Sequence, residues 1–372
     1  MKRFRSAAVT ALSLSCAACG NSNGLPTSEG LSAPPPMVFT MNNAEAANTL
    51  FAYRRSADGT LINVASIPTG GAGVGHGLEN QGALALSQDS RFLYVANPGS
   101  NDLSVFRLNG TDIAPSDRVP SGGVLPVSVA EWNGTVYVLN RHSSGDPDSG
   151  PSIEGFRVSN AGTLTAIRGS QIALRTANTN AAQIGISPDG RWIMVTERGV
   201  DQIDVIALSD ERTPGIPQGI ASAGQSPFGF AFSDTLQLYI AESAAGTTSA
   251  YDIDPRGRLS VLTPALSTGQ RATCWLAVTP DNRWVYVTNT SSRSISSYQA
   301  AEGKGLMLAV SVAATTAGPP IDIIIDMTGD HLSVLTADGS IETFQIDKTS
   351  GSLSSIQTIS GLPAGSNGLV GN

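Results

Sequence analysis

Short apolar segments alternate with polar turns along most of this chain, and one such pattern returns several times. In residues 83–106 an apolar segment is followed by a polar turn, a second apolar segment ending at Asn97, a polar loop and a third apolar segment. Short segments enriched in β-branched and aromatic residues and separated by turn residues are typical of antiparallel strands. This stretch alone predicts three consecutive strands, but it does not distinguish a sandwich from other all-β folds.

The same pattern recurs at residues 184–197 and 276–289, almost position for position. The turn of each copy contains an aspartate, which can accept hydrogen bonds from the turn backbone. In these two copies the next residue is Gly190 or Asn282, and both residue types tolerate a positive φ. The repetition therefore predicts hairpins of one kind, used several times in a repeating fold.

The residue that ends each second strand marks the repeat, and we assign these positions to Asn42, Asn97, Asn140, Glu197, Glu242, Asn289 and Thr336. Their separations are 55, 43, 57, 45, 47 and 47 residues. A period in the forties with about four short strands per unit is typical of propeller blades. We interpret residues 70–77 and 143–151, which fall in the two long intervals, as loop insertions.

The two ends of the repeating body complete each other. The first unit begins at Val38 with a second-type strand and lacks the inner strand that every later unit has, whereas residues 363–371 resemble the approach to the inner strand at 225–230. Such closure would leave no open edge at the seam. We therefore predict an all-β fold over residues 37–372, a seven-bladed β-propeller with four antiparallel strands per blade, in which the C-terminal strand completes blade 1.

Residues 1–19 have the features of an export signal. Three basic residues precede an uncharged segment, 6–15, which is too short to span a bilayer as a helix. The small residues that follow resemble a bacterial lipoprotein processing site, with Cys19 as the acylated residue and Cys16 as the alternative. A redox Cys-x-x-Cys motif is the competing interpretation, but no βαβ pattern follows it.

Residues 20–36 are rich in Asn, Ser, Gly and Pro and predict a flexible tether between this anchor and the body. Together with the signal, they predict a location in a bacterial cell envelope. We expect the lipid to be its only membrane attachment, at the outer membrane facing the periplasm. Without the signal peptide the chain has 19 basic and 30 acidic residues, a net charge of −11. That balance argues against nucleic acid or an anionic lipid surface as a partner.

Polar residues at the second-strand ends are the candidates for function, because those ends share one face of a propeller. Residues 141–142 and 197–198 lie on the adjacent blades 3 and 4. An arginine there could hold a carboxylate or phosphate by two parallel hydrogen bonds, and a histidine or glutamate could act as the base for water attack on a lactone. The candidate catalytic residues are Glu242, Glu197 and His142, and the candidate substrate-binding residues are Arg141, Arg198, Asn97 and Asn289.

These residues also have structural interpretations. Asn and Glu at strand ends can satisfy loop amides, and Glu197 with Arg198 can form a surface ion pair of little energetic consequence. Cys274, at the start of an inner strand, is more typical of a buried, inert thiol than of a nucleophile. Three scattered histidines give no metal-ligand spacing, so we expect no metal and no cofactor. A small-molecule ligand or an envelope protein is the expected partner of a monomer.

The repeats at residues 94–97 and 286–289, the Ser-Pro-Asp-Gly-Arg turn at 187–191 and the terminal closure together resemble the seven-bladed propeller lactonase family. That family includes a bacterial 6-phosphogluconolactonase and a fungal carboxymuconate cyclase. The repeats are equally similar to the YVTN-type propeller repeats of exported and surface proteins. The lactonase resemblance implies a carboxylic ester hydrolase acting on a small acidic lactone, and the YVTN resemblance implies an envelope propeller that binds a ligand or protein without catalysis.

The resemblance carries over to individual residues only in part. The family's blade 5 glutamate corresponds to Glu242, which matches. The family's histidine or arginine at the inner-strand starts falls on Gln183 and Phe228, and its arginine after the second strand of blade 6 falls on Thr290. Three of four positions therefore depart from the family pattern, which favours binding over catalysis unless the chemistry has moved to blades 3 and 4.

Overall fold

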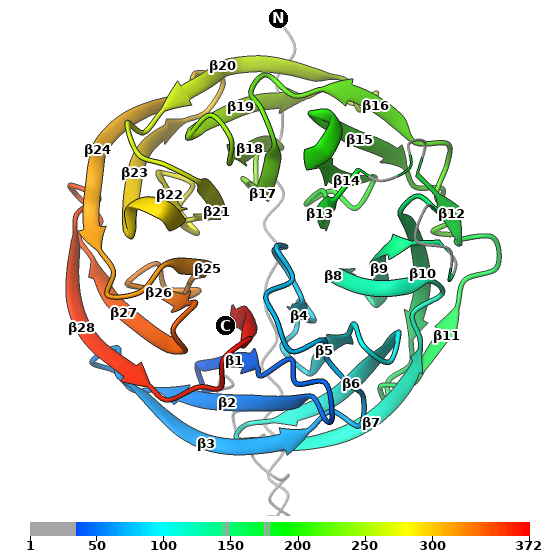
Figure 1. Cartoon of the computed structure of the whole chain (residues 1–372). Coiled ribbons are helices and arrows are strands. Elements are labelled where there is room, and N and C mark those ends of the chain that lie inside the picture. Colours follow the sequence, from blue (N-terminus) through cyan, green and yellow to red (C-terminus); the bar gives the residue numbers. More distant parts are fainter. Residues whose placement is uncertain (1–34, 144, 146–148, 175–176, 178) are drawn as a thin grey trace, which may run out of the picture. The chain divides into compact units, whose positions relative to one another are not determined.

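The computed structural model describes residues 35–143, 145, 149–174, 177 and 179–372 of the 372-residue chain. These residues form seven antiparallel sheets around a common axis, which confirms the predicted seven-bladed β-propeller (Figure 1). In six blades the innermost strand is the first in the chain, and the outermost strands form the rim. Helical structure in the described residues is limited to two short 3-10 helices, Arg198–Val200 (η1) and Thr290–Ser292 (η2).

Blades 1 to 3 hold the N-terminal strands together with the C-terminal strand. From the axis outward, blade 1 contains β29 (Asn367–Gly371), β1 (Met37–Met41), β2 (Thr49–Arg55) and β3 (Leu61–Pro68). In the same direction, blade 2 contains β4 (Leu84–Leu86), β5 (Phe92–Asn97), β6 (Asp102–Asn109) and β7 (Asp112–Pro120). Blade 3 contains β8 (Val124–Trp132), β9 (Thr135–His142), β10 (Ser152–Val158) and a split outer strand, β11 (Leu164–Ala166) and β12 (Ile172–Ala173).

The other four blades each have four strands, again in order from the axis outward. Blade 4 contains β13 (Ala181–Ile186), β14 (Trp192–Glu197), β15 (Gln202–Ala207) and β16 (Gln218–Ala221). Blade 5 contains β17 (Pro227–Phe232), β18 (Gln237–Glu242), β19 (Thr247–Ile253) and β20 (Leu259–Ser267). Blade 6 contains β21 (Thr273–Val278), β22 (Trp284–Asn289), β23 (Ser294–Ala301) and β24 (Gly305–Thr315). Blade 7 contains β25 (Pro320–Ile325), β26 (His331–Thr336), β27 (Ser340–Ile346) and β28 (Leu353–Ser360).

The repeated turn between the first and second strands has the chemistry that the sequence predicts. In blade 2 the Ser87 hydroxyl donates to Asp89 at 2.7 Å and accepts from the Phe92 N–H at 2.9 Å. Ser187 and Thr279 make the same pair of bonds in blades 4 and 6, at 2.6 and 3.0 Å in each. A positive φ follows the turn aspartate in all three blades, at Ser90 (55°), Gly190 (69°) and Asn282 (58°).

Apolar side chains fill the spaces between neighbouring blades. The described residues form seven clusters of buried hydrophobic side chains, each centred on one pair of adjacent blades. Between blades 2 and 3, for example, Tyr94 packs with Val138 and Phe156. Because a single blade cannot bury both of its faces, stacking around a closed ring supplies the core of the whole fold.

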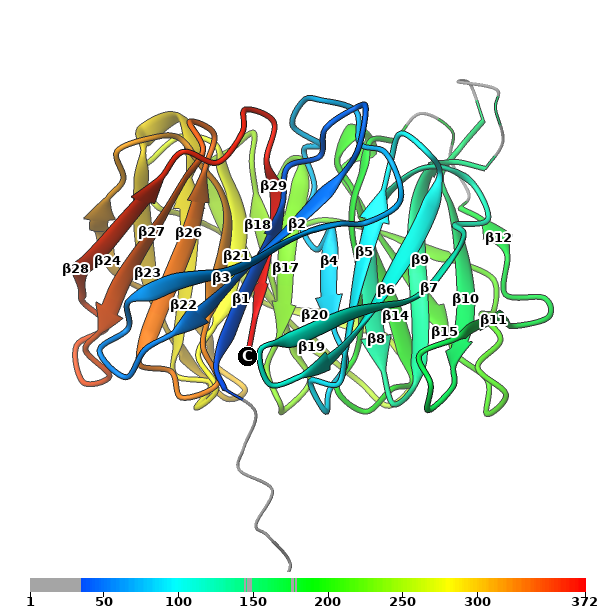
Figure 2. The same ribbon diagram turned by 90° about the horizontal axis from the view of Figure 1, so that it is seen from below.

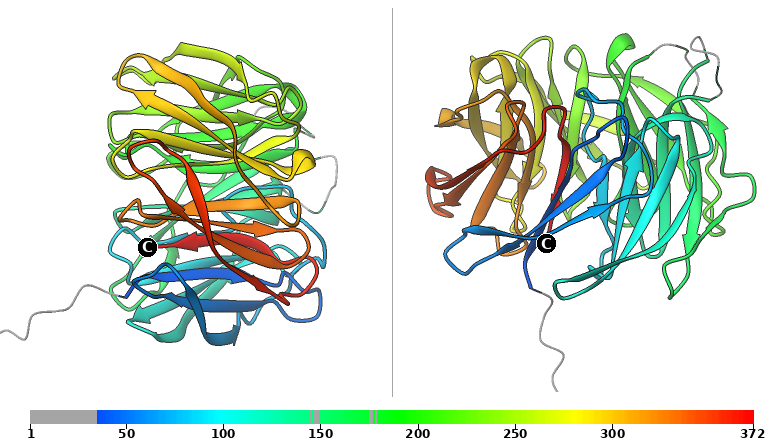
Figure 3. Two further views of the ribbon diagram at one scale, coloured as in Figure 1. Left: turned by 90° about the vertical axis from the view of Figure 1, so that its left-hand side faces the viewer. Right: turned by 60° about the horizontal axis from the view of Figure 1, so that its bottom comes forward.

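The chain termini meet in blade 1, as predicted. Strand β29 pairs antiparallel with β1, with Phe39 opposite Val370 and Thr40 opposite Leu369, and Figure 3 shows the red strand beside the blue one. The Met37 N–H donates to the Asn372 side-chain oxygen at 2.6 Å. The Leu369 N–H also donates to the carboxyl of the buried Asp322 in blade 7, at 2.8 Å. Thus β29 completes the sheet of blade 1 and also hydrogen-bonds to blade 7.

Candidate functional site

The loops between the second and third strands of the blades lie on one face of the ring, which we call the loop face; it is the upper face in Figure 2. The interpretation of residues 70–77 and 143–151 as loop insertions is consistent with this arrangement, because they fall between β3 and β4 and between β9 and β10. All seven sequence candidates lie near the second-strand ends at this face: Asn97, Arg141, His142, Glu197, Arg198, Glu242 and Asn289.

Asn97 and Asn289 are fully buried, and each ties its second strand to the following third strand. The Asn97 amide donates to Asp102 and to Ser104, both at 2.7 Å. The Asn289 amide donates to Ser294 at 3.2 Å and to Ser296 at 2.8 Å, five and seven residues further along. The geometry therefore gives both amides a structural role within their blades.

Glu242 occupies the same position in blade 5 and is also fully buried. Its carboxylate accepts hydrogen bonds from Thr247 and Ser249, both at 2.6 Å, and from Ser222 at 3.2 Å. A Cβ added to Gly224 would lie 2.0 Å from one carboxylate oxygen, so the backbone closes directly over this group. Hydroxyl donors can stabilise the charge of a buried carboxylate, and in blade 5 they surround it without leaving an opening for a substrate.

Glu197 in blade 4 has a different environment, although it is buried to the same extent. Its carboxyl accepts from the Thr179 hydroxyl at 3.0 Å and from the Gln202 amide at 3.2 Å, and the same amide donates to Asp204 at 2.8 Å. Burial and the nearby Asp204 charge raise the pKa of Glu197 to about 7, against the lowering effect of the Thr179 hydrogen bond. This glutamate therefore exchanges a proton near neutral pH.

Arg141 and Arg198 lie close to each other on the loop face. Arg198 pairs with Glu79 at 2.7 Å and lies over the Phe228 ring, with 4.9 Å between the guanidinium carbon and the ring centroid. The Arg141 guanidinium donates to the carbonyls of Leu78 and Glu79. Burial and repulsion from Arg198 lower the pKa of Arg141 to about 10. The sequence suggested an ion pair between Glu197 and Arg198. In the structure Arg198 forms its ion pair with Glu79 instead.

The two arginines keep unused hydrogen-bonding capacity. The Nε atoms of Arg141 and Arg198 are both buried and have no hydrogen-bond partner among the described residues. Among the described residues, Glu79 is the carboxylate that pairs with Arg198, and its side chain is 68% exposed. Within that part of the chain, two guanidinium groups with buried N–H donors lie beside one exposed carboxylate, which favours an anionic ligand.

A cavity of about 250 Å³ opens beside Arg141. It is lined by Arg141, His142, Leu125, Thr179 and Asn180, so it brings together two sequence candidates. Glu197 lies behind Thr179 and reaches the cavity only through that hydroxyl. The His142 Nδ1 lies 3.1 Å from the Ser149 carbonyl oxygen; in the tautomer that donates this hydrogen bond, Nε2 is a free base.

Residues 78–82 connect blades across the ring and place Glu79 at the site. The Gln81 side chain donates to the Leu276 carbonyl in blade 6 at 2.9 Å, and its backbone oxygen accepts from Ser128 in blade 3 at 2.7 Å. The Trp275 indole donates to the Asn80 carbonyl at 2.7 Å. In Figure 1 this segment runs from the rim toward the axis just before β4. A rigid connection of this kind holds Glu79 next to Arg198.

Several other candidates are set aside by their surroundings. Cys274 is buried and donates to the Ala272 carbonyl, and burial raises the pKa of its thiol to about 11, so it is not a thiolate nucleophile at neutral pH. Within the described ranges no group of three or more His, Cys, Asp or Glu side chains could hold a metal ion. The same part of the chain contains no helix with the length and apolarity to cross a membrane. Cys16 and Cys19 lie outside the described residues.

Sequence reasoning missed Glu79, Thr179 and Asp204. Glu79 reaches Arg198 across 119 positions of sequence through the loop between β3 and β4. Asp204 has a signal in the repeat: it lies seven residues after Glu197, just as Ser249 lies seven residues after Glu242. The strand register shows that these two positions are equivalent. Thr179 has no sequence signal that separates it from other loop threonines.

Fold and site together define a seven-bladed β-propeller with a cationic, cavity-bearing loop face. The chain belongs to the lactonase, 7-bladed beta-propeller family, whose model matches residues 36–145, 149–274 and 257–366. The resemblance noted from the repeats is thereby confirmed at the level of the family. A search of the curated proteins finds no match.

Solved structures share the fold at low sequence identity. A periplasmic gluconolactonase from Pseudomonas aeruginosa aligns with a TM-score of 0.73 and 17% identity, over 91% of this chain and 98% of its own. A protein from Lactobacillus plantarum aligns with a TM-score of 0.72 and 18% identity, over 91% and 99%. A putative 6-phosphogluconolactonase from Bacteroides fragilis aligns with a TM-score of 0.68 and 17% identity, over 92% and 100%. At these identities the likeness is one of fold.

Proposed function

We propose that this protein hydrolyses a small lactone that carries a carboxylate or phosphate group, at the loop-face cavity between blades 3 and 4. The observation that carries the proposal is the 250 Å³ cavity lined by Arg141 and His142, with Arg198 nearby. Membership of the lactonase family supports this reaction class. The volume of the cavity and the arginine in its lining favour a lactone that is small and negatively charged.

The proposed chemistry divides between the arginines and the histidine. Arg141 and Arg198 hold the anionic group of the substrate through their unused N–H donors. His142 Nε2 takes a proton from a water molecule as that water attacks the lactone carbonyl. The ring C–O bond then breaks, and the proton returns from His142 to the departing alkoxide, so that the product is a hydroxy acid. Glu197 is a positioning residue in this scheme, because it acts through Thr179.

A panel of acidic and neutral lactones, assayed with the full chain, tests this proposal. His142→Gln should lower kcat by about a hundredfold or more with little change in KM, because the base is removed and the arginines remain. Arg141→Met should instead raise KM for acidic lactones more than for neutral ones. His76→Gln is the matched control, because His76 is an exposed histidine in the loop that leads to Glu79 and does not line the cavity. Hydrolysis that neither His142→Gln nor Arg141→Met changes would contradict the assignment.

A second candidate function is binding of a small anion without catalysis. The observation that favours it is that neither Glu197 nor Glu242 lines the cavity, and that both carboxylates already accept hydrogen bonds from protein side chains. If no lactone is hydrolysed, titration calorimetry with small carboxylates and phosphates should still give binding that Arg141→Met weakens. Absence of both hydrolysis and anion binding would exclude the loop-face cavity as the site.

We also propose that the protein is exported and anchored in the bacterial cell envelope as a monomer, through a lipid on Cys19. The pattern of residues 1–19 supports this, and the fold is shared with a periplasmic gluconolactonase. Labelled fatty acid should be incorporated into the wild type and into Cys16→Ala but not into Cys19→Ala. Labelling of Cys19→Ala but not of Cys16→Ala would assign the lipid to Cys16. If the wild type is not labelled, the proposed lipid anchor is wrong.

A further inference from the structure

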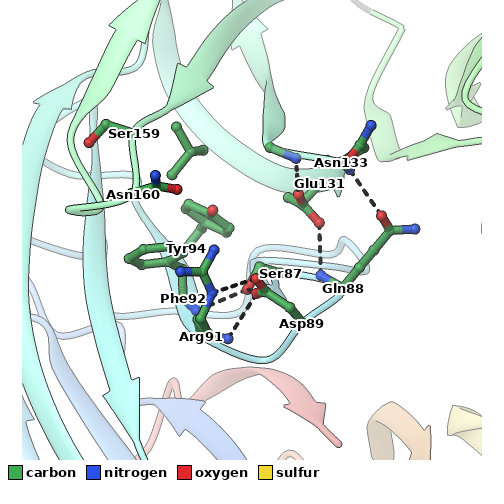
Figure 4. A pocket seen from close by; sticks show the side chains of 12 residues that line it. Ser87, Gln88, Asp89, Arg91, Phe92, Tyr94, Glu131, Asn133, Ser159 and Asn160 are labelled. Atoms are coloured by element: carbon green, nitrogen blue, oxygen red, sulfur yellow. Dashed lines mark hydrogen bonds and ion pairs between the residues drawn. The ribbon is translucent and has the colours of Figure 1, made fainter.

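A cavity of about 290 Å³ opens between blades 2 and 3 at the face opposite the loop face, next to the Ser87–Asp89 turn (Figure 4). Its lining includes Asp89, Phe92, Tyr94, Glu131, Ser159 and Asn160. None of them belongs to the site proposed for lactone hydrolysis. In Figure 4 Tyr94 lies between Asn160 on one wall and Glu131 on the other.

Tyr94 is one of four tyrosines that occupy the same position in their blades, three residues before the end of the second strand: Tyr94, Tyr137, Tyr239 and Tyr286. The Tyr286 hydroxyl donates to the Gly351 carbonyl of the next blade at 3.0 Å, and the Tyr137 hydroxyl donates to the Arg212 carbonyl of its next blade. Tyr239 donates to Gln237 in its own strand. The Tyr94 hydroxyl is buried and has no hydrogen-bond partner among the described residues.

Phe92 lines the cavity at a position where blade 6 has a larger side chain. The equivalent residue in blade 6 is Trp284, whose indole donates to the Lys348 carbonyl of blade 7 at 3.0 Å. The corresponding space between blades 6 and 7 measures only about 50 Å³. In both places a glycine of positive φ faces the ring, Gly162 beside Phe92 and Gly351 beside Trp284. The backbone around Phe92 therefore resembles one that accommodates tryptophan, but the side chain does not fill it.

The charges around the cavity exclude an anionic ligand. Arg91 is the cation in the lining, and it is already paired with Asp89 at 2.5 Å. Glu131 accepts hydrogen bonds from the Gly134 and Gln88 N–H groups at 2.7 and 3.0 Å and has no cationic partner there. Burial, together with the Asp89 charge, raises the pKa of Glu131. A second negative charge would therefore be repelled.

The remaining polar groups both donate and accept hydrogen bonds. The Tyr94 hydroxyl can do either, the Asn160 amide can do both, and the Ser159 oxygen, which accepts from the Ala161 and Thr163 N–H groups, still carries a proton to donate. Glu131 is an acceptor, and Phe92 and Val158 supply apolar wall. Alcohol hydroxyls on a carbon frame match this mixture, because each hydroxyl also donates and accepts.

We propose that the cavity between blades 2 and 3 binds a small neutral polyol of monosaccharide size, with the Tyr94 hydroxyl and the Glu131 carboxylate as its central hydrogen-bond partners. Phe92 defines the space by being smaller than its tryptophan counterpart. The site is separate from the loop-face cavity, and it disfavours the anionic groups that the loop-face cavity favours.

Three probes of one size and different charge test the proposal with the full chain: D-glucose, D-glucuronate and D-glucosamine. Saturation-transfer NMR and titration calorimetry should detect binding of glucose and none of glucuronate at this site. Glucosamine should not bind more tightly than glucose, because Arg91 lies in the same lining. Phe92→Trp should abolish glucose binding, because the indole fills the cavity as Trp284 does in blade 6. The thermal stability of the Phe92→Trp variant should be at least that of the wild type.

Tyr94→Phe separates binding from structure. Removing a buried hydroxyl without a partner should not lower the thermal stability, whereas losing one hydrogen bond to the ligand should weaken glucose binding by about tenfold. Tyr286→Phe is the matched control, because it removes a hydroxyl with a protein partner; it should lower stability and leave glucose binding unchanged. The proposal is overturned if glucose does not bind, if either charged probe binds more tightly than glucose, or if Phe92→Trp and Tyr94→Phe leave glucose binding intact.

Discussion

Blades 4 and 5 end their second strands in the same residue type, yet the two glutamates have different properties. Glu197 and Glu242 are both fully buried, and each lies opposite the first residue of the following strand, Gln202 or Thr247. In blade 5 three hydroxyl groups donate to the carboxylate. In blade 4 one hydroxyl and one amide donate, and a second carboxyl group lies nearby.

The residue seven positions further along accounts for much of this difference. Blades 2, 5 and 6 have serine there, and its hydroxyl hydrogen-bonds the strand-end side chain. Blade 4 has Asp204, whose charge adds to the effect of burial and raises the pKa of Glu197. One scaffold position can therefore hold a structural carboxylate or one that exchanges a proton near pH 7, depending on a neighbour in the adjacent strand.

The largest expected effect is the difference in stability between two variants that carry the same substitution, one in blade 4 and one in blade 5. Glu242→Gln replaces an acceptor of three hydroxyl hydrogen bonds with an amide, and it should lower the free energy of unfolding at pH 8 by about 2 kcal/mol. Glu197→Gln should raise it, because the substitution removes the repulsion between the Glu197 and Asp204 carboxylates. Unfolding of both variants and the wild type in guanidinium chloride at pH 8 measures these free energies. Changes of the same sign in the two variants would contradict the comparison.

The sequence predicted the fold because the features that define it are local or periodic. The Ser-x-Asp turns, the spacing of the second-strand ends and the unpaired terminal segments are each visible without knowledge of the structure. The sequence also placed Arg141 and His142 beside each other and near blade 4, and both line the loop-face cavity.

The sequence could not separate the site residues from the structural ones. Glu197 and Glu242 have the same position in the repeat, and only the strand register shows which neighbour faces each. Glu79 reaches Arg198 from a loop that crosses between blades, and no periodicity reports such a contact. Chemistry that depends on long loops or on cross-strand neighbours is thus the part that the sequence pattern leaves open.

The pH dependence of stability gives a second and more specific effect. Because the pKa of Glu197 is about 7 in the fold and about 4.5 without it, the folded state retains a proton that the unfolded state loses. Stability should therefore fall as the pH rises from about 4.5 to about 7, by on the order of 3 kcal/mol from this group alone. Burial also raises the pKa of Asp322, to about 8, and adds to the same trend.

Glu197→Gln isolates the contribution of Glu197, because Asp322 is present in both proteins. Unfolding titrations at several pH values should show a steeper loss of stability in the wild type than in the variant between about pH 4.5 and about 7. Glu242→Gln, in which Glu197 is intact, should retain the wild-type slope. Parallel curves for the wild type and Glu197→Gln would mean that folding does not raise the pKa of Glu197.

The smallest expected effect sharpens the comparison most directly. Asp204→Ser gives blade 4 the residue that blade 5 has at the equivalent position, Ser249. It should lower the pKa of Glu197 but leave it above the usual value, because burial, the larger cause, remains. Side-chain carboxyl NMR titration measures the midpoint directly. Asp252→Ser, which removes an exposed aspartate from blade 5, is the control for net charge. An equal shift in both variants would assign the effect to overall charge instead of to the cross-strand neighbour.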